Sequence, residues 1–151
     1  KEFQIDTDFE LLFPDEYINN ISERLSLYSE LGAVKNILEL EAYEKRLIDR
    51  FGPLPKEAVS LLNSVRIKWK AKQIGLERLI LKQNKMVGYF IGDQQSNFYQ
   101  SNRFMHVMKF AQQNGNLCKV KEKETKNGLR LLITFENVKS INKALELIEM
   151  I

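Results

Sequence analysis

Residues 46–62, RLIDRFGPLPKEAVSLL, contain the end of one helix and the start of the next. An apolar stripe that includes Leu47 repeats at the spacing of one helical face, and Gly52 then supplies the left-handed residue that commonly closes a helix. Pro53 cannot continue that helix, whereas Pro55 has the fixed φ that suits the first turn of a new one. The stretch therefore predicts a rigid corner between two helices.

The whole chain has the length and composition of one domain, residues 1–151. With 151 residues, 44% of them hydrophobic, it can bury a core without metal or disulfide support. The single cysteine, Cys118, excludes an internal disulfide, and no cluster of cysteine and histidine suits zinc, so we expect no metal and no cofactor. The apolar runs are far too short to span a bilayer and the first residues are no signal peptide, so the cytoplasm is the expected setting. The abrupt start at Lys1 and finish at Ile151 also suit a piece of a longer protein.

Charge is distributed unevenly along the chain. Residues 1–60 hold 7 basic and 13 acidic side chains, whereas residues 61–151 hold 16 basic and 7 acidic ones. The asymmetry indicates a basic surface for nucleic acid, two lobes that attract each other or a charged partner, or solvated faces that happen to segregate.

The first residues predict a strand. Apolar and polar residues alternate over 3–13, which is the period-two pattern of a half-buried strand. Its polar face carries Asp6, Asp8 and Glu10, but same-face residues lie roughly 7 Å apart and no convergent ligand is identifiable. The interpretation of these carboxylates as solvation, or as guards against edge pairing, is favoured over a metal site.

Two helices are predicted between this strand and the corner. Pro14 and Asp15 open the first, which ends near Gly32. Asn36 and Glu39 form a cap and its reciprocal partner at the start of the second. The apolar stripe expected to be buried on the first helix is Tyr17, Ile18, Ile21, Leu25 and Tyr28.

The second half of the chain predicts two hairpins, each followed by a helix. The expected elements are strands 77–82 and 86–91, a helix capped by Ser101 or Asn102, strands 117–124 and 129–135 around an Asn127-Gly128 turn, and a last helix capped by Asn137. The fold class is therefore α+β. A helical N-terminal half, a strand then three helices, is packed with antiparallel hairpins and two further helices, with the helices mainly on one side of a sheet.

Two basic segments are candidates for contact with nucleic acid. The helix over residues 66–72 places Arg66 with Lys70, and Lys68 with Lys72, at i, i+4 spacing. In the hairpin over residues 119–130 the candidates are Lys119, Lys121, Lys123 and Arg130. Basic stems beside a buried stripe are frequent on ordinary helices, and the hairpin has no exposed aromatic residue among its lysines, so both signals are weak.

The sequence has no recognisable catalytic site. Phosphate-binding glycine loops, a nucleophile elbow and kinase or metalloprotease signatures are all missing. The one histidine, His106, has neither a second ligand nor a nucleophile paired with it, so a surface or structural role is expected. We therefore predict no catalytic residues, although catalytic groups dispersed through the sequence would escape this search.

An ordered set of short motifs resembles a known family. These motifs are Pro14-Asp15-x-Tyr17, Arg24-Leu25-x-x-Tyr28, and Glu44-x-x-Leu47-Ile48-Asp49-Arg50-Phe51-Gly52-Pro53-Leu54-Pro55 followed by Leu61-Leu62. Together they resemble the C-terminal (TRCF) domain of bacterial transcription-repair coupling factors, the Mfd family. The resemblance covers nearly the whole chain and is strongest over residues 5–75.

The resemblance implies a regulatory function without catalysis. Full-length members of the family are ATP-driven DNA translocases that displace stalled RNA polymerase and recruit UvrA for nucleotide excision repair. For the terminal domain it implies intramolecular docking on the UvrB-like module, which hides the UvrA-binding surface and restrains the motor. The alternative is a nucleic-acid-binding accessory domain that uses helix 66–72 and hairpin 119–130; in neither case is a membrane a partner.

Three residues of the corner helix are the expected docking interface. Asp49 and Arg50 are the polar positions of the LIDRFG motif, and Arg46 lies one turn before Arg50. Arg46 departs from the family's pattern, in which an acidic residue is common, so the charge pairing there is either reversed or lost. Exposed ion pairs contribute only about 0–1 kcal/mol each, so several weak pairs acting together would suit an interface that opens.

Overall fold

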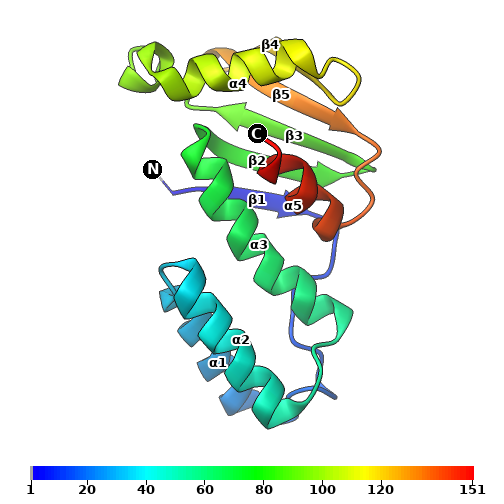
Figure 1. Cartoon of the computed structure of the whole chain (residues 1–151). Helices are drawn as coiled ribbons and strands as arrows, with labels where there is room; N and C mark the ends of the chain where they lie inside the picture. The colour runs from blue at the N-terminus through cyan, green and yellow to red at the C-terminus, as the bar shows by residue number, and fades with distance from the viewer. Residues whose placement is uncertain (1) are drawn as a thin grey trace. The chain divides into compact units, whose positions relative to one another are not determined.

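The computed structural model describes residues 2–151 and confirms the α+β class (Figure 1). Five α-helices, one 3-10 helix and a five-stranded sheet occur in this range. Their bounds are β1 Gln4–Thr7, α1 Ile21–Ala33, α2 Ile37–Phe51, α3 Lys56–Gln73, β2 Leu76–Lys82, β3 Lys85–Phe90, η1 Asn97–Gln100, α4 Asn102–Gln113, β4 Cys118–Thr125, β5 Gly128–Glu136 and α5 Ile141–Glu149. The chain divides into two compact units, residues 10–66 and the remainder, which are described separately. The assignment of residues 1–151 to a single domain stays a prediction.

The helical unit, residues 10–66, contains α1, α2 and the first part of α3. The predicted cap of α2 is confirmed, since the Asn36 side chain accepts a hydrogen bond of 2.9 Å from the Glu39 amide. Gly52 closes the helix with a φ of 90°, and α3 begins directly after Pro55. The unit is built around the corner that the sequence predicted.

Residues of the motifs around Tyr17 and Arg24 tie the loop before α1 to the corner and to the start of α1. The Tyr17 hydroxyl donates a 2.8 Å hydrogen bond to the Gly52 carbonyl oxygen. Arg24 donates to the Ile18 carbonyl oxygen at 2.6 Å and lies 3.3 Å from the Asp15 carboxylate. The motifs around Tyr17 and Arg24 therefore have a structural role within the unit.

The first helix differs from the sequence prediction. It begins at Ile21 with Asn20 as its cap, because residues 14–18 form a hydrogen-bonded turn instead of a first helical turn. Of the expected stripe, Ile18 is buried, but Ile21 and Leu25 are 66% and 63% exposed. The stripe prediction failed because the later start removes the turn that would have carried Tyr17 and Ile18 on the same helix.

Tyr43 is the largest fully buried side chain of the helical unit, and its hydroxyl donates a 2.6 Å hydrogen bond to the Leu27 carbonyl oxygen. Burial, with a smaller contribution from the nearby Glu30 carboxylate, raises the pKa of this phenol well above its ordinary value of 10.0. The folded state therefore keeps a proton that the unfolded chain releases above about pH 10.

We expect the free energy of unfolding to fall as the pH rises above about 10, because the unfolded state then binds fewer protons than the folded state. Urea unfolding midpoints measured from pH 8 to pH 11 would show a shallower decline for Tyr43→Phe than for the parent chain. Some decline should persist in the variant, since burial also raises the pKa of Tyr17. Equal slopes for the two proteins would contradict the assignment.

The sheet unit contains five strands in the order β1-β2-β3-β5-β4. Strands β2 to β5 pair antiparallel as two hairpins, as predicted, whereas β1 pairs parallel with β2 through Ile5 opposite Leu79. The sheet is thus mixed, and the predicted strand over residues 3–13 is wrong beyond Thr7, where the chain bends away. Parallel pairing of distant segments has no local sequence signal.

The two faces of the sheet differ in burial. Alternate residues on one face are fully buried and form the core: Leu79, Leu81, Met86, Ile133 and Phe135. Cys118 and Val120 of β4 lie on this same face by the register with β5, and α4 packs beside β4. The opposite face carries Arg78, Tyr89 and the lysines of β4.

The cap of α5 and the turn of the second hairpin differ from the sequence prediction. Ser140, not Asn137, caps α5, and its hydroxyl oxygen accepts a 3.0 Å hydrogen bond from the Lys143 amide. Asn137 instead adopts a φ of 58° just before that cap. In the second hairpin the turn residues are Lys126 and Asn127, one position before the predicted Asn127-Gly128 pair, and Gly128 begins β5 with a positive φ.

Candidate functional site

The outer face of α2 is an exposed surface of the helical unit with both apolar and charged side chains. Leu40, Tyr43 and Leu47 are fully buried on the inner side of the helix. At 100° per residue the positions opposite them form a continuous strip, which we call the outer α2 face. Its residues are Leu38, Glu41, Ala42, Lys45, Ile48 and Asp49, and all are exposed.

Two of these residues are apolar side chains that the sequence did not assign to a site. Leu38 is 74% exposed and Ile48 is 40% exposed. Ile48 also lines a shallow depression of about 360 Å³ together with Glu41, Lys45 and the Glu44 to Arg66 pair. The available signal was that both residues lie off the buried stripe.

Asp49 carries the only carboxylate among the predicted docking residues, and this carboxylate has no partner in the described part of the chain. Within residues 2–151, Asp49 makes no ion pair and no side-chain hydrogen bond. Its position two turns from Glu41 and one turn from Lys45 puts it at the corner end of the outer α2 face. An exposed, unpaired charge at a fixed position is available to a partner.

Arg46 and Arg50 are instead engaged within the unit. Arg46 forms an ion pair with Glu30 of α1, and Arg50 forms one with Glu23 of α1. The guanidinium of Arg50 also lies 5.0 Å from the centre of the Phe51 ring. These pairs are largely exposed, so each contributes about 0–1 kcal/mol, and a partner carboxylate could replace the glutamate at small cost.

The residues predicted to contact nucleic acid on α3 do not form a basic ridge. Arg66 is partly buried, donates a 2.9 Å hydrogen bond to Asn63 and lies 3.3 Å from the Glu44 carboxylate. Lys68 and Lys70 are half-buried, and Lys72 is exposed. The structure therefore gives Arg66 a structural partner, and contact of helix 66–72 with nucleic acid stays a prediction.

Arg130 also has internal partners. Its guanidinium donates a 2.8 Å hydrogen bond to the Phe90 carbonyl oxygen and lies 3.5 Å from the Glu77 carboxylate. The side chains of Arg130 and Glu77 are only 19% and 17% exposed. Arg130 thus fastens β5 to its neighbours, although its buried Nε atom has no hydrogen-bond partner among the described residues.

Lys119, Lys121 and Lys123 are exposed on the edge strand β4, as the sequence predicted. The sequence did not predict that Tyr89 of β3 lies beside them, with its hydroxyl 3.4 Å from the Lys123 ammonium group. Arg78 and Arg130 lie 5.8 and 5.6 Å from the centre of the Tyr89 ring. An aromatic side chain therefore does accompany the lysines, although two guanidinium groups already contact its ring.

No catalytic constellation is found in the described part of the chain. The His106 imidazole contacts the Ile151 carbonyl oxygen at 2.9 Å, and burial raises the pKa of the Cys118 thiol. No group of three or more His, Cys, Asp or Glu side chains in residues 2–151 is placed to hold a metal ion. The same residues contain no helix that combines the length and hydrophobicity required to cross a bilayer.

The model of the TRCF domain family matches residues 7–101. The transcription-repair-coupling factor of Escherichia coli K12 is 40% identical over 68 residues, which is 45% of this chain and 6% of that protein. The factor of Rickettsia prowazekii is 25% identical over 141 residues, 93% of this chain and 12% of that protein. The chain thus spans about a tenth of the length of these curated relatives.

The fold has a counterpart among solved structures. The crystal structure of the C-terminal domain of a transcription-repair coupling factor superimposes with a TM-score of 0.65 at 20% identity. The match covers 99% of this chain and 96% of the other. It therefore includes both the helical unit and the sheet unit.

Proposed function

The chain belongs to the TRCF domain family, and from this we propose that it is a non-catalytic regulatory domain of a transcription-repair coupling factor. The parent protein would be an ATP-dependent DNA translocase that displaces stalled RNA polymerase and recruits UvrA. The domain would dock on the UvrB-like module of the same polypeptide through the outer α2 face, mask the UvrA-binding surface there and restrain the motor.

The unpaired Asp49 beside the exposed side chain of Ile48 is the observation that carries this proposal. Ile48 offers a small apolar contact, and the Asp49 carboxylate offers a charge that the rest of the unit leaves free. Contacts between domains that must separate are comparatively polar and bury roughly 600–1,500 Å². The outer α2 face has that mixed character.

The rigid setting of the face supports a docking function. The Tyr17 hydrogen bond to the Gly52 carbonyl oxygen fixes the corner end of α2. A surface that is held in its binding geometry loses little conformational entropy when its partner arrives. Weak individual contacts are then sufficient for binding and still allow release.

We expect the chain to bind the separately produced UvrB-like module of its parent protein in a calorimetric titration. Replacing Ile48 by Ser and Asp49 by Ala together should weaken that binding about tenfold, since truncated interface residues commonly cost about 1 kcal/mol or more. Glu16→Ala is the matched control, because Glu16 is another exposed carboxylate of the helical unit outside the outer α2 face.

A nucleic-acid-binding accessory function is the second candidate, favoured by Tyr89 beside Lys123. A short DNA duplex titrated in parallel separates the two functions. Absence of binding to the module, together with duplex binding that falls steeply with salt and is lost in the triple Ala variant of Lys119, Lys121 and Lys123, would contradict docking.

A further inference from the structure

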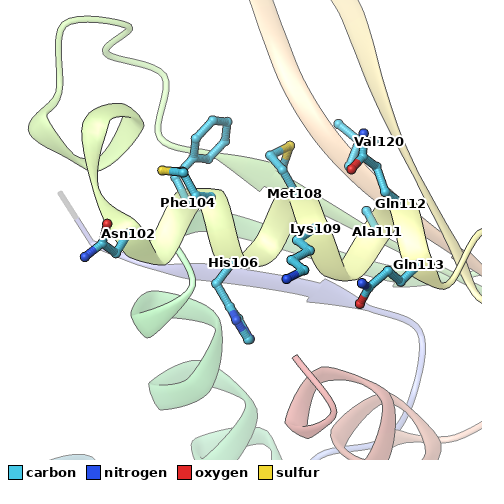
Figure 2. A pocket seen from close by; sticks show the side chains of 10 residues that line it. Asn102, Phe104, His106, Met108, Lys109, Ala111, Gln112, Gln113 and Val120 are labelled. Carbon is cyan, nitrogen blue, oxygen red and sulfur yellow. The ribbon is translucent and has the colours of Figure 1, made fainter.

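An open groove of about 1000 Å³ runs along α4 in the sheet unit and reaches Val120 of β4. Figure 2 shows Phe104 and Met108 projecting to the same side of α4 as Val120 of β4, whereas His106 projects to the other side. Ala111 continues the apolar lining toward the end of the helix. Together with Met105 these residues form a strip along α4, which we call the α4 groove.

One end of the α4 groove is rigid. The Ser101 hydroxyl caps α4 by accepting a 3.2 Å hydrogen bond from the Phe104 amide. The Phe104 ring packs edge to face against Phe98 and Tyr99, with centroids 5.4 and 5.1 Å away. Phe104 is thus a fixed aromatic wall at the start of the helix.

The middle of the groove is adaptable and exposed. Met105 is 66% exposed, and Met108 is half-buried beside it. Unbranched thioether side chains adjust to the shape of an apolar partner, and methionine is common on surfaces that bind amphipathic helices. A large exposed methionine beside a preformed wall is a feature of a binding surface.

The polar residues of the groove favour a negatively charged occupant. Helix α4, NRFMHVMKFAQQ, has basic residues but no Asp or Glu. The polar lining residues that accompany the apolar ones are Lys109 and neutral amides, and no carboxylate is among the lining residues. Glu122, two residues beyond Val120 on β4, is not part of the lining. The sheet unit as a whole has an excess of basic side chains.

We propose that the α4 groove binds an acidic amphipathic helix of a protein partner. The twelve residues of α4 extend roughly 18 Å, which matches about three turns of a partner helix. Apolar anchors at positions i, i+4 and i+7 of the partner would lie along Phe104, Met105 and Met108, and its flanking carboxylates would face Lys109.

Nucleic acid fits the α4 groove less well. Lys109 is the one side chain of the lining with a permanent positive charge, and tight phosphate binding requires several convergent charges. The Phe104 ring contacts other aromatic rings and does not present a free platform for base stacking. Apolar anchoring is therefore favoured over contact with a phosphate backbone.

A fluorescent 15-residue helical peptide with Leu at positions 4, 8 and 11 and Glu on the flanking positions is the probe. We expect anisotropy titrations with the 151-residue chain to show micromolar binding, since interfaces of this size are at the low end for specific complexes. Met105→Glu should weaken binding of the acidic peptide at least tenfold. Lys109→Glu should reverse the charge preference, so that this variant binds the same peptide with Lys in place of Glu more tightly than the acidic peptide.

Matched controls separate the groove from general effects of charge. Arg103→Glu reverses a charge on α4 outside the groove lining, and Leu129→Glu introduces a charge at another exposed apolar position, so both should leave binding within about twofold. Asp49→Ala should also have no effect, which keeps this proposal independent of docking by α2. Because Met105 is exposed, its variants should stay folded, and circular dichroism with Met105→Ala as a milder variant checks this.

Three results would overturn the proposal. These are equal binding of the acidic and the Lys-substituted peptides, binding that Met105→Glu does not change, and tighter Met105-sensitive binding of a single-stranded oligonucleotide. The last result would assign the groove to nucleic acid.

Discussion

Replacing Gly75 by alanine is expected to lower the free energy of unfolding by about 3 kcal/mol. Gly75 has a φ of 89°, and a Cβ added there would lie 2.1 Å from the nearest carbon of the Phe98 ring. That ring cannot move aside easily, because it packs against Phe90, Tyr99 and Phe104 at centroid distances of 5.4–6.2 Å. Alanine would therefore be strained both in its backbone and in its packing.

Gly52→Ala is the matched control for this prediction. Gly52 has a φ of 90°, but nothing lies within 4 Å of an added Cβ. Only the backbone strain remains, so the expected loss is about 1–2 kcal/mol. Urea unfolding followed by circular dichroism measures both variants. Equal losses would contradict the steric argument, and Phe98→Ala should cost less in the Gly75→Ala background than in the parent.

Arg130→Met is expected to destabilise the chain by about 3 kcal/mol. The substitution preserves much of the side-chain volume but removes the hydrogen bond to the Phe90 carbonyl oxygen and the positive charge beside the Glu77 carboxylate. Loss of a largely buried, charge-assisted hydrogen bond is strongly destabilising, because the Phe90 carbonyl oxygen loses its guanidinium donor. The unfolding midpoint in urea is again the measurement.

Arg78→Met provides the contrast. Arg78 also lies over the Tyr89 ring and pairs with a carboxylate, that of Asp6, but the two side chains are 46% and 39% exposed. Its loss should cost less than about 1 kcal/mol. Equal losses of unfolding free energy in the two variants would contradict the prediction that burial makes the contribution of Arg130 to stability the larger one. A large effect of Arg130→Met would also mean that reduced DNA binding by this variant is not by itself a sign of a DNA contact.

The corner could be predicted because its signals are local. Gly52 has to be left-handed, Pro55 has to open a helix, and Asn36 caps through an amide three residues on. Each of these effects depends on a few neighbouring residues. The structure confirms all three.

The sequence predictions were wrong where contacts between residues far apart in the sequence determine the local structure. The helix expected at Pro14 begins at Ile21, since the preceding loop is held by Arg24 and by the Tyr17 hydrogen bond to Gly52, a residue 35 positions away. Local propensity favoured a helix start at Pro14, and tertiary hydrogen bonds favoured a turn. The exposure of Ile21 follows from the same difference.

The candidate sites were predicted only in part, for the same reason. The exposure of Asp49 could be predicted because the outer side of a helix follows from its period, whereas its role in docking stays a prediction. Tyr89 was missed because its neighbour Lys123 is 34 residues away and belongs to another strand. The α4 groove was also missed, since its second wall, Val120, comes from the strand that follows the helix.

In mechanical terms, the parallel pairing of β1 with β2 gives an applied force a path through the sheet that leaves out residues 10–66. A force applied between residues 2 and 151 passes from β1 through its hydrogen bonds with β2 into the sheet and then to α5. Residues 10–66 form the loop of chain between these two paired strands and do not carry that force. The outer α2 face lies in this loop, so tension on the chain ends would not stretch it until the four residues of β1 had detached.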